Sequence, residues 1–151
     1  QLNFNYINYY IKMDKAVFYL IGYKFNHVSL NLDNIPSNAS FDLEFTPKGE
    51  YVQSERSFIT WILYFKAWEK GQEQSNPKIL VNCVASFKFK ENISLAEIPN
   101  FFYPNSIAIL FPYVRAFVST LTLQANIKPI LLPTLNLSSL QDILRENTTT
   151  K

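Results

Sequence analysis

The sequence feature that most restricts the fold is a long apolar segment near the C-terminal end of the chain. It runs from Pro129 to Leu137 and reads Pro-Ile-Leu-Leu-Pro-Thr-Leu-Asn-Leu. Each proline lacks a backbone N–H and restricts the residue before it, so the segment forms neither a helix nor an inner strand. An extended segment this apolar must be packed on the protein's own core or form part of a binding surface.

An amphipathic helix is predicted before this segment. Because proline is tolerated only near the first turn of a helix, the regular part is expected to start close to Pro112, and Pro129 ends it. The 3.6-residue period places an apolar face opposite a polar one. The apolar face holds Val114, Phe117, Val118, Leu121 and Ala125, and the polar face holds Arg115, Ser119, Thr122 and Asn126.

A short final helix is predicted after the apolar segment. Ser138, followed three residues later by Gln141, resembles a capping box, and the helix would carry Leu140, Ile143 and Leu144. Residues 145–151 are expected to form a poorly ordered tail. Residues 1–15 show no clear period and are expected to form a loosely held lead-in.

The first part of the chain predicts four strands. Apolar residues alternate from Val17, and the phase reverses near Asn26-His27, which indicates a bulge. A second strand starts at Phe41 and is expected to end at Pro47-Lys48-Gly49, and a fourth alternates from Ile79 to Phe89. Between them, residues 58–68 are apolar on both faces, which predicts that helices or another subunit cover both faces.

Strands followed by helices predict the α+β class, with a four-stranded antiparallel sheet followed by a long and a short helix. A chain of 151 residues is expected to form one domain, residues 1–151. The connection over residues 91–105 is expected to be irregular.

Few residues in the chain suit catalysis or metal binding. There is one histidine, His27, and one cysteine, Cys83, which is too few for a zinc site without carboxylates. The three glycines are isolated, so no phosphate-binding loop is present. Asp42 and Glu44 share a polar strand face, which is typical of a solvated surface. We therefore predict no enzymatic activity, no metal and no cofactor.

The composition also limits the partners. A net charge of +2 without clusters of basic residues argues against nucleic acid. One cysteine excludes an internal disulfide and is compatible with a reducing compartment, so a cytoplasmic location is expected. Uninterrupted apolar stretches are shorter than the roughly 20 residues of a membrane helix, so no stable membrane insertion is expected.

Two interpretations of the apolar segment remain open. It is either a strap packed on its own sheet or the wall of an apolar groove that binds polypeptides by buried area. In the second interpretation the segment contributes its aliphatic side chains, with two aromatic residues of the sheet as additional lining. The predicted client-binding residues are Ile130, Leu131, Leu132, Leu135, Leu137, Phe41 and Phe45.

The same region resembles a known family. Leu110-Phe111-Pro112-Tyr113-Val114-Arg115, followed by Pro129, Leu132-Pro133 and Asn136-Leu137, is similar to the C-terminal half of SecB, the bacterial protein-export chaperone. Tyr23 to Leu30 is similar to the first strand of that family. The resemblance spans about residues 16–144, and residues 110–137 are its specific part.

The resemblance implies an ATP-independent holdase, a homotetramer built as a dimer of dimers that binds unfolded or precursor polypeptides in apolar grooves. Val114, Phe117, Val118 and Leu121 would pack the core and contribute to the oligomer interface. SecB proteins pass their clients to the SecA motor through an acidic sheet face. Here the corresponding first-strand positions are His27 and Asn31, so SecA is a weaker expectation than client holding.

Three alternatives remain beside general export. Some SecB-like proteins are dedicated chaperones of an antitoxin or another single client. A small hydrophobic-ligand carrier would use the sheet and a helix as a lid. An adaptor would recognise one folded partner.

Overall fold

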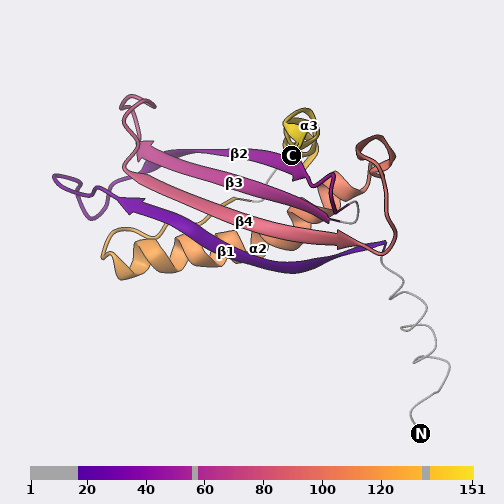
Figure 1. Cartoon of the computed structure of the whole chain (residues 1–151). Coiled ribbons are helices and arrows are strands. Elements are labelled where there is room, and N and C mark those ends of the chain that lie inside the picture. The colour runs from indigo at the N-terminus through magenta and orange to yellow at the C-terminus, as the bar shows by residue number, and fades with distance from the viewer. Residues whose placement is uncertain (1–16, 56–57, 134–136) are drawn as a thin grey trace, which may run out of the picture.

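A computed structural model of the chain describes residues 17–55, 58–133 and 137–151. The predicted lead-in, residues 1–15, lies outside this part of the chain. The strands are β1 (Phe18–Leu30), β2 (Phe41–Tyr51), β3 (Phe58–Glu69), β4 (Ile79–Phe89) and β5 (Thr148–Thr150). The helices are a 3₁₀ turn, η1 (Leu95–Glu97), and the α-helices α2 (Phe102–Gln124) and α3 (Leu137–Glu146) (Figure 1).

The strands form one sheet in the order β1-β4-β3-β2-β5. The four long strands are antiparallel, and only the short β5 runs parallel to its neighbour β2. The sheet is followed by a long and a short helix, so the predicted α+β architecture is confirmed.

β1 is an edge strand with two bulges. The pairing with β4 shifts between Phe25 and His27, which confirms the predicted bulge at Asn26, and it shifts again between Leu20 and Gly22. A residue in a bulge reverses the faces on which the following side chains lie. The second shift was not predicted, and it places Tyr19 on the opposite face of the sheet from Tyr23.

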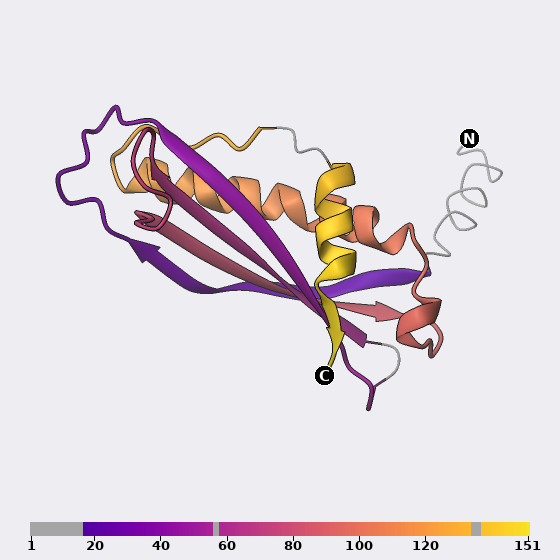
Figure 2. The same cartoon turned by 90° about the horizontal axis from the view of Figure 1, so that it is seen from above.

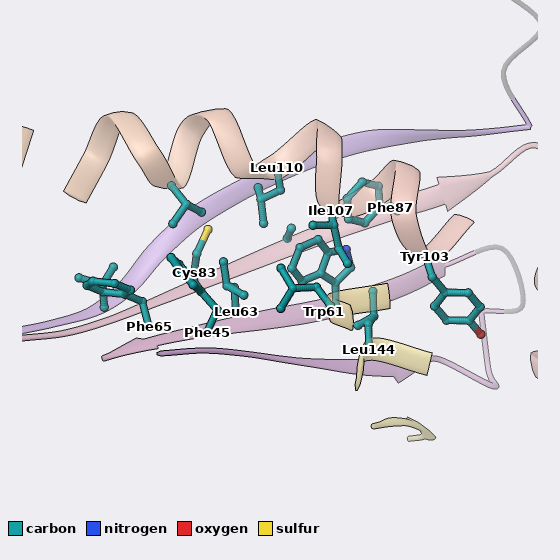
Figure 3. Close-up of a cluster of buried hydrophobic side chains, with 14 of the residues drawn as sticks. Phe45, Trp61, Leu63, Phe65, Cys83, Phe87, Tyr103, Ile107, Leu110 and Leu144 are labelled. Carbon is teal, nitrogen blue, oxygen red and sulfur yellow. The ribbon is translucent and has the colours of Figure 1, made fainter. Parts of the chain in front are cut away.

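Both α-helices lie on one face of the sheet, and α2 passes behind the strands in the view of Figure 1 (Figures 1 and 2). Every second residue of β3 and β4 points toward the helices and is buried. α2 packs on them through residues such as Leu110, Val114 and Val118, and α3 contributes Leu140 and Leu144 (Figure 3). Each Å² of apolar surface removed from water stabilises the folded state by ~25 cal/mol. This single contiguous core is therefore the main source of stability.

α2 begins at Phe102, ten residues before Pro112, so the predicted helix start was wrong, and the connection over residues 91–105 is shorter than expected. A proline inside a helix leaves the carbonyl four residues earlier, here that of Ala108, without its usual donor. Ala108 and Pro112 both lie on the exposed side of α2, where that carbonyl is open to solvent.

β2 continues through Pro47 to Tyr51, so its predicted end was also wrong. The carbonyl of Pro47 accepts a hydrogen bond from Asn147 Nδ2 at 3.2 Å, so the backbone of Pro47 faces away from β3. β5 pairs only with residues 49–51, and a proline on a free strand edge removes no sheet hydrogen bond.

The tail expected to be poorly ordered instead forms β5. Three consecutive β-branched threonines suit a strand, and the edge of β2 offers backbone partners. Lys151 N donates to the Tyr51 carbonyl at 2.9 Å, and Gly49 N donates to the Asn147 carbonyl at 3.3 Å.

α2 is also long and apolar enough to cross a membrane by length and composition. Core helices of other proteins pass the same test. One face of α2 packs on the sheet, but only 33% of its most apolar window is buried. The remaining apolar surface of α2 is therefore available for other contacts.

Candidate functional site

The candidate site is the apolar segment after α2, which we call the strap and define as residues 128–133. Its start is fixed to the β1–β2 connection, because Lys128 N donates to the Ser37 carbonyl at 2.7 Å. Its centre is fixed to α2, because Ile130 N donates to Thr122 Oγ1 at 2.9 Å. The Thr122 hydroxyl in turn donates to the Val118 carbonyl at 2.8 Å. The prediction that Thr122 lies on the polar face was wrong, because this side chain is buried under the strap.

The strap is extended, so successive side chains point in opposite directions. Ile130 and Leu132 are buried in the core, whereas 70% of the Leu131 surface is exposed. The two interpretations of the segment therefore apply to different residues. Ile130 and Leu132 pack on the protein itself, and Leu131 alone of the three is displayed.

Leu131 borders an open groove beside the outer side of α2. The groove has a volume of about 340 Å³ and is lined by Leu131, Phe111, Pro112, Arg115, Ala116 and Ser119. We call it the strap groove. Its walls are mainly apolar, and Arg115 is the charged residue in the lining. Such a surface binds apolar side chains of a peptide by area and places one cation near them.

A second open groove lies nearer the N-terminal end of α2, beside the start of β1. It measures about 440 Å³ and is lined by Val17, Phe18, Phe101, Asn105, Ala108 and Ile109. Both grooves lie along the exposed side of α2. None of these lining residues except Leu131 was predicted as a client-binding residue.

The other predicted groove residues have different places. Phe45 is buried and packs against Phe65 at a ring distance of 5.1 Å and against Phe111 at 5.9 Å. Phe41 is partly buried at the edge of the core. Leu135 and the side chain of Leu137 lie outside the described residues.

The predicted interface residues of α2 pack on the protein's own sheet. Val114 and Val118 are buried, and Leu121 is partly buried against the core. Phe117 stacks on Phe25 of β1, with ring centroids 3.8 Å apart and planes inclined by 10°. The expected packing in the core is confirmed, whereas their role between subunits stays a prediction.

The exposed side of α2 carries apolar residues that the sequence analysis missed. Ile109, Tyr113 and Leu123 are exposed by 38%, 45% and 58%. They lie along the flank of α2 that faces β1, spread over about four turns, and we call them the α2 stripe. The helical period in the sequence indicates the strongest apolar face of α2, and the weaker face that holds these three residues gives no comparable signal.

The one cysteine and the one histidine lie on opposite faces of the sheet. Cys83 is buried on the helix side, and burial raises the pKa of its thiol to about 11. His27 is exposed and pairs with Asn82, whose side chain points away from the helices. The two cannot form a nucleophile–base pair. Among the described residues, no group of three or more His, Cys, Asp or Glu is placed to hold a metal ion.

Asp42 and Glu44 lie on the face of the sheet that the helices do not cover. Glu44 forms an ion pair with Lys66 at 3.0 Å and accepts a hydrogen bond from Gln74 Nε2 at 3.2 Å. This geometry fits the predicted solvated surface.

Comparisons with known proteins find similarity both by sequence and by fold. The sequence is 31% identical over 137 residues to the uncharacterized protein MJ0357 of Methanocaldococcus jannaschii, covering 83% of this chain and 86% of that protein. No protein-family model matches the sequence. The structure is similar to the Mycobacterium tuberculosis SecB-like chaperone Rv1957, solved in complex with a ChAD peptide from the antitoxin HigA1, with a TM-score of 0.56 and 14% identity over 79% of this chain and 91% of that one. This likeness shows a shared SecB-like fold.

Proposed function

We propose that this chain, which belongs to the same family as MJ0357 of Methanocaldococcus jannaschii, is an ATP-independent chaperone that holds unfolded polypeptide segments on apolar surfaces. The observation that carries the proposal is the strap groove, in which an exposed leucine faces an apolar helix side on a SecB-like fold. A client segment would place apolar side chains against Leu131 and Phe111. Its backbone would need no specific partner, so the binding would tolerate many sequences.

Both general export and a dedicated client agree with such a groove. The fold likeness to a chaperone that was solved with an antitoxin peptide favours a dedicated client as the second candidate. Delivery of clients to SecA in the cytoplasm belongs to the export alternative.

Among the described residues, the interior between the sheet and its helices offers little room for the small-ligand carrier alternative. The cavity between α2, α3 and the sheet, beside Trp61, Leu63 and Ile107, has a volume of about 10 Å³. That volume accommodates about one water molecule and is far below the several hundred Å³ of a typical ligand pocket.

The assembly proposed with this function is a homotetramer, a dimer of dimers. β1 has a free edge in the described sheet, and the α2 stripe beside it is apolar and exposed. An exposed strand edge and an exposed apolar stripe are the features that subunit contacts cover.

The test of client holding is the Leu131→Ser variant. It removes the displayed side chain of the strap and leaves the buried Ile130 and Leu132 in place. We expect suppression of the aggregation of a chemically denatured substrate protein to fall severalfold, with no change in oligomer mass. Ser75→Ala, in the exposed β3–β4 connection, is the control and should hold the substrate as the unmodified protein does. If Leu131→Ser suppresses aggregation as well as the unmodified protein does, the strap groove is not the client-binding site.

A further inference from the structure

The face of the sheet that points away from the helices is the second large apolar surface of the protein. The sequence predicted that both faces of residues 58–68 are covered. In the described part of the chain, α2, α3 and the strap all cover the same face, and the other is open (Figure 2). We call the open side the outer face.

The centre of the outer face is an apolar stripe along β3 and β4. In the sheet register Ile62 lies beside Val84, Tyr64 beside Asn82, and Lys66 beside Leu80. Tyr64 is 39% exposed, and Ile62, Val84, Leu80 and Trp68 are partly exposed. From Ile62 to Trp68, six residues of strand make the stripe roughly 20 Å long, at about 3.3 Å per residue.

Two lysines flank this stripe, one on each side. The register places Lys24 of β1 beside Val84, and Lys48 of β2 beside Ile62. The row across the sheet therefore reads Lys24, Val84, Ile62, Lys48. Three strand spacings of about 4.8 Å put the two lysine backbones roughly 14 Å apart.

Neither lysine is engaged in an ion pair with a residue that the structure describes, although Glu50 lies two residues from Lys48 on the same face of β2. Both lysines are exposed. Of the three acids of β2, Glu44 pairs with Lys66, and Glu50 pairs with Lys151 at 3.6 Å. The third, Asp42, lies six residues along the strand from Lys48. The outer face thus has an apolar centre and a net positive rim, with the exposed His27 next to Lys24 along β1.

We propose that the outer face docks an amphipathic helix of a partner protein that carries carboxylates on both flanks of its apolar side. An α-helix is about 10–12 Å wide with its side chains, so a helix lying along β3 and β4 fits between Lys24 and Lys48. Its apolar side covers Ile62, Tyr64 and Val84, and its Glu or Asp side chains reach the lysines. A second copy of this face carries the same two lysines, and two of its three β2 acids, Glu44 and Glu50, are already paired.

The experiment measures binding of two labelled 14-residue helical peptides by fluorescence anisotropy. Both peptides have the same leucine positions, and their flanks carry either glutamate or lysine. The unmodified protein should bind the glutamate peptide, more weakly as salt rises, and the lysine peptide at least tenfold more weakly. The double variant Lys24→Glu/Lys48→Glu should reverse this preference.

The matched control is Lys70→Glu/Lys90→Glu, which makes the same change in net charge at exposed positions just beyond the ends of β3 and β4, at least six residues of strand from the row of Lys24 and Lys48. It should keep the preference of the unmodified protein. Leu131→Ser should also keep it, and this separates the outer face from the proposed client site. Tyr64→Ser should weaken binding of the glutamate peptide about tenfold, and the protein should still prefer it to the lysine peptide.

Four results would overturn the proposal. One is equal binding of the two peptides. Another is equal loss of binding in both lysine double variants. The third is a single-stranded RNA oligonucleotide that binds through Lys24 and Lys48 more tightly than the glutamate peptide, which would assign the face to nucleic acid. The fourth is a change in oligomer mass in Lys24→Glu/Lys48→Glu, which would assign the face to a second copy.

Discussion

At the scale of single residues, neighbours in the strap have separate tasks. Leu131 is 70% exposed, whereas Leu132 is 1% exposed and belongs to the core. An extended backbone alternates its side chains, so one leucine stabilises the fold and the next faces solvent. A substitution of both at once would mix a loss of stability with a loss of client binding.

The two leucines should therefore differ in their contribution to stability. Leu132→Ala leaves a cavity in a packed core and should lower the free energy of unfolding by about 2–4 kcal/mol. Leu131→Ala should change it by less than about 0.5 kcal/mol, as expected for a surface site. Urea denaturation of both variants measures this. Equal losses in the two variants would contradict the assignment of their side chains.

Cys83 makes stability depend on pH at the alkaline end. Burial raises the pKa of its thiol from 9.0 to about 11. As the pH rises through this window, the unfolded chain loses the thiol proton while the folded chain keeps it, so the free energy of unfolding falls. Below about pH 9 both states keep the proton, and the contribution is constant.

The Cys83→Ala variant isolates this effect from the tyrosines and lysines that titrate in the same range. Between about pH 9 and pH 11, the thiol should lower the free energy of unfolding by up to roughly 1.4 kcal/mol for each pH unit. The Cys83→Ala variant should lack this decrease. Denaturation at a series of pH values for both proteins measures the difference. Parallel pH profiles would show that the thiol does not contribute.

At the scale of elements, the C-terminal strand depends on a glycine of its neighbour. β5 approaches β2 so closely that a Cβ atom at Gly49 would lie 3.1 Å from both Cβ and Cγ2 of Thr148 and even nearer to its hydroxyl. The Thr148 hydroxyl donates to the Leu144 carbonyl at the end of α3, which fixes its position. The close approach of β5 thus requires a residue without a side chain.

Gly49→Ala should therefore displace β5 from the sheet. We expect faster hydrogen exchange of the Lys151 amide, which donates to the Tyr51 carbonyl, together with a loss of stability of about 1–3 kcal/mol. Gly22→Ala is the matched control, because a Cβ there would meet no atom within 4 Å. Unchanged exchange in Gly49→Ala would show that β5 accommodates the methyl group by a small shift.

The elements also show how far the sequence predicts this fold. The four long strands and the bulge at Asn26 follow from alternation, which depends only on which face is buried. The early start of α2, the passage of β2 through Pro47 and the pairing of β5 depend on distant partners such as Asn147 and Gly49. Local patterns carry no information about those partners.

The candidate site was predictable to a similar degree. The strap follows from its two prolines, but which of its leucines is exposed depends on the bond between Ile130 N and Thr122 Oγ1. The helical period alone places Thr122 on the polar face and does not show that its hydroxyl binds the strap. Phe111 and Ala116 join the groove only because the strap returns along α2.

At the scale of the whole molecule, the described residues offer three apolar surfaces for association besides the second groove at the start of β1. The strap groove and the outer face are proposed for a client and for a partner helix, and the α2 stripe remains. The stripe lies beside β1, where Tyr113 stacks on Tyr23 with ring centroids 4.5 Å apart. The free edge of β1 and the exposed side of α2 therefore form one continuous surface.

The α2 stripe should hold the subunits together. We expect the unmodified protein to have a mass near four times 17.6 kDa by light scattering after gel filtration. Leu123→Asp places a charge on the most exposed residue of the stripe, and burying an unpaired carboxylate in a subunit contact is strongly unfavourable. This variant should form smaller species that keep their secondary structure. Gln72→Asp makes the same change in charge in an exposed loop and should keep the full mass. A monomeric unmodified protein, or an unchanged mass in Leu123→Asp, would contradict assembly through the stripe, because the residue could then not lie between subunits.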